Sequence, residues 1–83
     1  MARKVFVRVL AEFDEQGRIL PRSLTWEDGR QYEVDRVLQI RPGVSLKVGG
    51  SGIRYTCRIS GRQVYLFQDG NLWYMEGRDE IAT

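Results

Sequence analysis

Residues 53–59, Ile53-Arg54-Tyr55-Thr56-Cys57-Arg58-Ile59, decide the fold class of this chain. Apolar and polar side chains alternate through the whole stretch. A period of two is typical of a β-strand with one face on a core and the other toward solvent. The sequence therefore predicts a strand that directs Ile53, Tyr55, Cys57 and Ile59 inward, and Arg54, Thr56 and Arg58 outward.

Similar patterns on both sides of this segment predict further strands. Together the predicted strands cover residues 4–13, 18–26, 30–40, 53–59, 64–67 and 72–75. Glycine-containing turns separate most of them, since glycine accepts the positive φ that tight hairpins need. In the first strand, alternation predicts that the inward side chains are Val5, Val7, Val9, Ala11 and Phe13.

Three segments depart from regular alternation. Pro21 cannot donate a ladder hydrogen bond, so we expect it at an edge or a bulge. In residues 30–40 the row Tyr32, Val34, Leu38 and Ile40 is interrupted by Arg36, which predicts a bulge near Asp35 that turns Arg36 outward. Residues 41–52 contain Pro42 and four glycines, and predict a mobile loop, with or without a short strand inside it.

Five or six short strands joined by short turns predict an all-β domain, specifically a small antiparallel barrel. We favour an SH3-like barrel over an oligonucleotide-binding type, because the latter usually has a helix where residues 41–52 form a poor helix sequence. Residues 1–76 are expected to form the single domain. Residues 77–83 lack periodicity and are expected to be a frayed tail.

Length and composition narrow the class of protein. The chain has 83 residues, a net charge of +2 and only one cysteine. One domain is all that this length supports, and a single cysteine favours a reducing, cytoplasmic location over secretion. We find no export signal and no apolar run long enough to cross a membrane.

The residues that usually perform catalysis are scarce. The chain has no histidine, which removes the commonest general base and a leading metal ligand. Cys57 is expected in the core, and the acidic pairs lie in predicted turns or the tail, where turn preference explains them. The sequence therefore predicts no enzyme activity, no metal site and no cofactor.

A row of arginines beside aromatic residues is the best candidate site. The residues expected to contribute are Arg54, Arg58, Lys47, Tyr65, Phe67 and Trp73. Bases stack on aromatic rings and guanidinium groups pair with phosphates, so this surface suits single-stranded nucleic acid. The alternative is a protein partner or a homodimer that uses the last two strands, which are apolar on both faces. A plainer alternative also stands, in which the aromatic rings lie inside the barrel and the arginines are only solvated.

The glycine-rich segment 47–52 allows two interpretations. Exposed backbone amides with Lys47 and Arg54 at its ends are the ingredients of a phosphate cradle. In nucleotide-binding loops a helix follows the glycines, whereas here a strand is predicted to follow them. A flexible linker between strands is therefore favoured.

Residues 21–38, PRSLTWEDGRQYEVDRVL, and 52–77, GIRYTCRISGRQVYLFQDGNLWYMEG, resemble a family of small uncharacterised bacterial proteins. The pattern of Pro21, Trp26, Gly29-Arg30, Tyr32, Val34 and Leu38 is also similar to small β domains that accompany some bacterial DNA-repair polymerases. The resemblance implies a stand-alone bacterial domain. It implies no particular activity and assigns no site residues.

Overall fold

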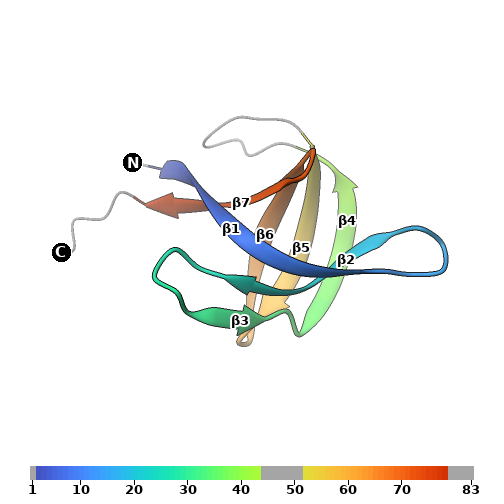
Figure 1. Cartoon of the computed structure of the whole chain (residues 1–83), viewed down its shortest axis with the longest axis horizontal. Helices are drawn as coiled ribbons and strands as arrows, with labels where there is room; N and C mark the ends of the chain where they lie inside the picture. The colour runs from blue at the N-terminus through green and yellow to red at the C-terminus, as the bar shows by residue number, and fades with distance from the viewer. Residues whose placement is uncertain (1, 44–51, 79–83) are drawn as a thin grey trace.

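The structure, a computed structural model, describes residues 2–43 and 52–78 and shows an all-β protein built on one antiparallel sheet (Figure 1). The described residues form seven strands, in the spatial order β3-β2-β1-β7-β6-β5-β4. Their bounds are β1 Ala2–Phe13, β2 Ile19–Thr25, β3 Gln31–Glu33, β4 Arg36–Pro42, β5 Ile53–Ile59, β6 Arg62–Asp69 and β7 Leu72–Arg78. The predicted strand at residues 53–59 is confirmed with the same bounds. Thr56, which alternation directed toward solvent, is only 7% exposed, so the outer face of this strand is covered at its centre.

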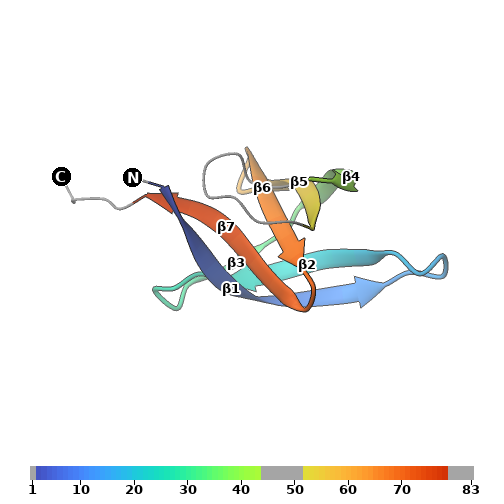
Figure 2. The ribbon, with the colours of Figure 1, turned by 90° about the horizontal axis from the view of Figure 1, so that it is seen from above.

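The sheet curls into a half-barrel because one long strand joins its two parts. The first half of β1 pairs with β7 and the second half with β2. The two end strands, β3 and β4, are joined by only Val34 and Asp35, which brings the ends of the sheet toward each other. Val34 N donates to Arg22 O and Asp35 N donates to Arg58 O, each at 2.8 Å, so this link is held on both sides. Figure 2 shows the resulting curl from above.

The inner face of the curl holds the hydrophobic core. Its buried members are Leu24, Val34, Tyr55, Cys57, Ile59 and Leu66. They come from β2, β5 and β6 and from the link between β3 and β4, so the core forms only when the sheet has curled. Among the residues described, none forms a helix long and apolar enough to cross a membrane.

The end of the β1–β2 hairpin departs from the predicted burial. Ala11 and Phe13 were expected inside, yet both are exposed, Phe13 by 71%. The prediction is wrong here because the hairpin extends beyond the rest of the sheet, so its tip has nothing to pack against (Figures 1 and 2). The prediction for Pro21 is confirmed, since it pairs with Ala11 at a shift in the β1–β2 register.

Residues 30–40 form two strands instead of one. The chain leaves β3 after Glu33, passes Val34 and Asp35, and enters β4, which pairs with a different neighbour. A bulge between Val37 and Gln39 then changes the register, and Leu38 and Ile40 are exposed on this edge strand instead of buried. This division explains why seven strands are found where five or six were expected.

Two strand ends also differ from prediction. Ile53 was expected inside but is exposed at the start of β5. Strand β7 continues through Gly77 and Arg78, the first two residues of the predicted tail, because they pair with Arg3 and Ala2. The other residues of that tail, and residues 44–51 of the predicted loop, lie outside the described part of the chain.

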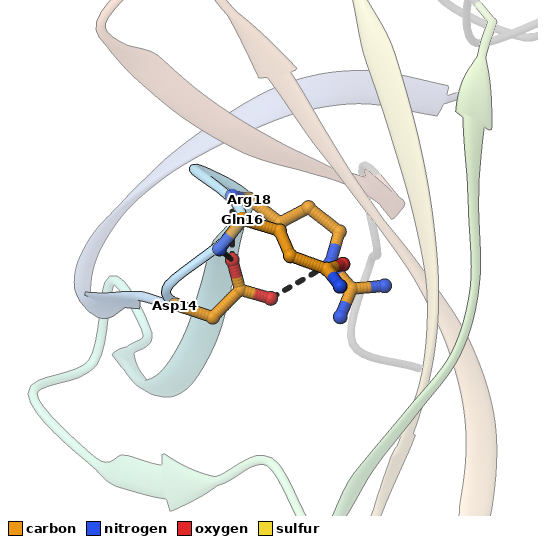
Figure 3. Close-up of polar contacts among 3 residues, drawn as sticks. All are labelled: Asp14, Gln16 and Arg18. Atoms are coloured by element: carbon orange, nitrogen blue, oxygen red, sulfur yellow. Dashed lines mark hydrogen bonds and ion pairs between the residues drawn. The ribbon is translucent and has the colours of Figure 1, made fainter.

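The turn between β1 and β2 shows how local sequence sets the hairpin register. Asp14 Oδ1 accepts hydrogen bonds from the backbone N–H of Gln16 at 2.9 Å and of Arg18 at 2.8 Å, and Oδ2 accepts from Arg18 Nε at 2.7 Å (Figure 3). Gly17 closes the turn with φ of 82°. These hydrogen bonds lower the pKa of Asp14 below its ordinary value, and the bond from the Arg18 backbone N–H has the largest effect.

Candidate functional site

Four arginines share the outer face of β4 and β5. Arg54 and Arg58 lie four residues apart on β5 and so project to the same side. Arg41 is directly opposite Arg54, and Arg36 is directly opposite Arg58. Directly opposite residues of neighbouring strands lie on the same face. We call this group, Arg36, Arg41, Arg54 and Arg58, the arginine face.

The bulge in β4 is what brings Arg36 and Arg41 to one side. They are five residues apart, a spacing that places side chains on opposite faces of a regular strand. The extra residue at Leu38 restores the register, so that Gln39 pairs with Thr56 and Arg41 with Arg54. The sequence predicted a bulge near Asp35, but the strand is interrupted there and the bulge lies between Val37 and Gln39. Arg41 could not be assigned to the site from the sequence, because the partner of each strand was unknown.

The charges on the arginine face are not balanced by nearby carboxylates. Within the described residues, none of the four arginines forms an ion pair. Like charges directly opposite each other destabilise a sheet, so this arrangement is not explained by folding. Arg54 Nε is buried and has no hydrogen-bond acceptor among the described residues, so it is not itself open to a ligand. Arg36, Arg41 and Arg58 are exposed, and their guanidinium groups can bind an anion.

Tyr65 provides an aromatic ring beside these charges. It lies on β6 directly opposite Thr56, on the same face as the arginines. The Arg54 guanidinium Cζ lies 4.8 Å from the centre of the Tyr65 ring, within cation–π distance. The tyrosine is 40% exposed, which leaves part of its ring open to a ligand.

The other predicted site residues lie elsewhere. Phe67 is on the outer face, opposite Arg54, but it is only 2% exposed and stacks on Tyr74 with ring centres 5.1 Å apart. Trp73 is on the inner face, where its ring centre lies 5.1 Å from that of Tyr55. Lys47 lies outside the described residues. The structure thus brings together Arg54, Arg58 and Tyr65 from the predicted set.

Cys57 has the properties of a core residue. It is fully buried on the inner face, and burial raises the pKa of its thiol to about 11. A thiol that stays protonated at neutral pH is a poor nucleophile and a poor metal ligand. Across residues 2–43 and 52–78, no group of three or more acidic or cysteine side chains is suited to hold a metal ion.

A second opening, which sequence reasoning missed, lies at one end of the half-barrel. This pocket has a volume of about 330 Å³ and lies between residues of the β2–β3 hairpin and residues of the β5–β6 hairpin. It could not be found from alternation, because its walls belong to strands that are distant in the sequence.

Comparison with known proteins gives no assignment. No family model matches the chain, and no curated protein or solved structure is significantly similar to it. The resemblance to a bacterial family therefore stays a prediction.

Proposed function

We propose that this protein is a non-catalytic binding module that holds single-stranded nucleic acid on its arginine face. The observation that carries the proposal is that Arg41 is opposite Arg54 and Arg36 is opposite Arg58 in the sheet register, while none of the four forms an ion pair among the described residues. Phosphate groups would neutralise these charges, and arginine binds phosphate through two parallel hydrogen bonds.

The spacing of the face suits an extended strand of nucleic acid. We call the cross-strand pairs Arg41–Arg54 and Arg36–Arg58 the two arginine rows. They are four residues apart along β5, a separation of about 13 Å at the usual rise per residue. Tyr65 lies between the rows in the sheet register and offers a ring on which a base can stack. Phosphates would therefore lie at the rows, with a base at the tyrosine.

The rival function is association with a protein or with a second copy of this chain. Phe6, Leu10 and Leu72 are each more than half exposed on the outer face of β1 and β7. Exposed apolar side chains that gather on one face are typical of protein interfaces. This candidate depends on apolar contact, and so it predicts the opposite response to salt.

The barrel type and the location belong to the same proposal. Hairpin-joined strands that curl around one core favour an SH3-like arrangement, as the sequence predicted. A single cysteine favours the cytoplasm. The absence of histidine and the protonated state of Cys57 favour a binding role over catalysis.

Fluorescence polarisation with labelled single-stranded DNA and RNA tests the proposal. Binding should weaken steeply as salt rises from low to moderate concentration. Arg58→Gln should weaken it further and reduce the slope of log affinity against log salt by about 0.7. Arg30→Gln removes the same charge from a 76% exposed side chain in the β2–β3 turn and should change little.

Two results would overturn the proposal. One is no binding of either nucleic acid at low salt. The other is an equal loss of affinity in Arg58→Gln and Arg30→Gln, which would mean that only total charge matters. A dimer that sedimentation detects at moderate salt, and that Leu72→Ser dissociates, would support the rival function instead.

A further inference from the structure

The pocket at the end of the half-barrel is separate from the arginine face. Its lining residues are Leu24, Trp26, Tyr32, Ile59, Ser60, Arg62, Val64 and Met75. Ile59 is opposite Arg62 and belongs to the core, which places the pocket on the inner side of the sheet. Arg58, by contrast, is on the outer side. A ligand in the pocket would therefore not compete with one on the arginine face.

The pocket is apolar inside. Leu24 and Ile59 are buried core residues, and Tyr32, Val64 and Met75 are partly buried and pack against them. Trp26 is held in place by its backbone, which donates to Arg30 O at 2.8 Å and accepts from Gly29 N at 2.9 Å. These contacts make a preformed site for a flat apolar group, which is the usual character of small-molecule pockets.

Four polar side-chain groups of the lining have no hydrogen-bond partner among the described residues. They are the guanidinium of Arg62, the indole N–H of Trp26 and the hydroxyls of Tyr32 and Ser60. No carboxylate is among the described lining residues, so Arg62 gives the pocket an unbalanced positive charge. The Ser60 backbone N–H, in contrast, already donates to Asp35 Oδ2 at 3.1 Å. An anionic group is the complement that this lining lacks.

We propose that this pocket binds a small aromatic anion, with its ring among Trp26, Tyr32 and Met75 and its negative group at Arg62. The volume of about 330 Å³ is at the lower end of ligand pockets, which run from about 300 to 1,000 Å³. The ligand is therefore limited to one or two rings. The apolar lining provides affinity, and Arg62 selects the charged compound over a neutral one of the same shape.

Titration of isotope-labelled protein with 2-naphthoate tests this site by nuclear magnetic resonance. The chain has two tryptophans, and only Trp26 lines the pocket, whereas Trp73 packs against Tyr55. The indole N–H signal of Trp26 should shift and saturate, while that of Trp73 moves much less. The neutral analogue 2-naphthamide should bind about two- to fivefold more weakly, the range of an exposed ion pair.

The variant Arg62→Gln separates the charge from the apolar contact. Arg62 is exposed, so the variant should fold, and it should bind naphthoate and naphthamide equally. Arg30→Gln is the matched control and should keep the preference for naphthoate. The proposal is overturned if the Trp26 signal does not move, if shifts of equal size occur at Trp73, or if Arg62→Gln keeps the preference.

Discussion

The two faces of β5 differ in how their side chains are matched by neighbours. On the inner face, Tyr55 and Cys57 are surrounded by apolar side chains of the opposite wall. On the outer face, Arg54 and Arg58 are opposite two further arginines. The inner face is arranged as stability requires, whereas the outer face repeats a charge where the opposite charge would stabilise the sheet. The fold alone therefore explains the composition of the inner face but not that of the outer face.

The largest expected effect is on the inner face. Leu66 is fully buried opposite Tyr55, so Leu66→Ala should lower the free energy of unfolding by about 2–5 kcal/mol. A domain of this size has about 4–12 kcal/mol in total. Denaturant unfolding measures the change. Leu72→Ala is the matched control, because Leu72 is 58% exposed and its loss should cost no more than about 0.5 kcal/mol. Equal losses in the two variants would contradict the division into faces.

The next effect is a pH dependence that originates in Cys57. Burial raises its pKa from 9.0 to about 11, so between these values the unfolded chain loses the thiol proton and the folded chain keeps it. The unfolded state then binds fewer protons, and stability falls as pH rises through this range, by about 3 kcal/mol in total. Burial also raises the pKa of Tyr55, which adds a loss of the same sign at higher pH.

Chemical unfolding of the natural chain and of Cys57→Ala, compared from pH 8 to about pH 10.5, isolates the thiol contribution. The natural chain should lose more stability over this range than the variant, which keeps only the Tyr55 contribution. Parallel curves would show that the thiol ionises as easily in the folded state as in the unfolded one. Burial of Cys57 would then not raise the pKa of its thiol.

The smallest effect has the opposite sign and belongs to the outer face. Arg58→Glu would place a carboxylate opposite Arg36 and should stabilise the sheet by about 0.5–1 kcal/mol, or roughly 2–8 °C in Tm. The same variant should lose affinity for nucleic acid. Thermal unfolding and fluorescence polarisation measure the two changes. A variant that is less stable than the natural chain would mean that repulsion between the four arginines does not destabilise the sheet.

The sequence alone determined the all-β class, the strand at residues 53–59 and the orientation of Tyr55, Cys57, Arg54 and Arg58. These features depend on local alternation and on glycine turns, which a short stretch of chain specifies by itself. The irregularities at Pro21 and near Arg36 were also visible, because each breaks a local rule.

The neighbours of each strand and the limits of the sheet depend on contacts between distant parts of the chain. Phe13 alternates like a buried residue but lies on a hairpin tip that extends past the core. Trp73 and Phe67 could not be assigned to a face until the pairing of β6 with β7 was known. Arg41 joined the arginine face only through a bulge. The physical reason is that burial and cross-strand contact depend on partners distant in the chain, while alternation reports only that a strand has two faces.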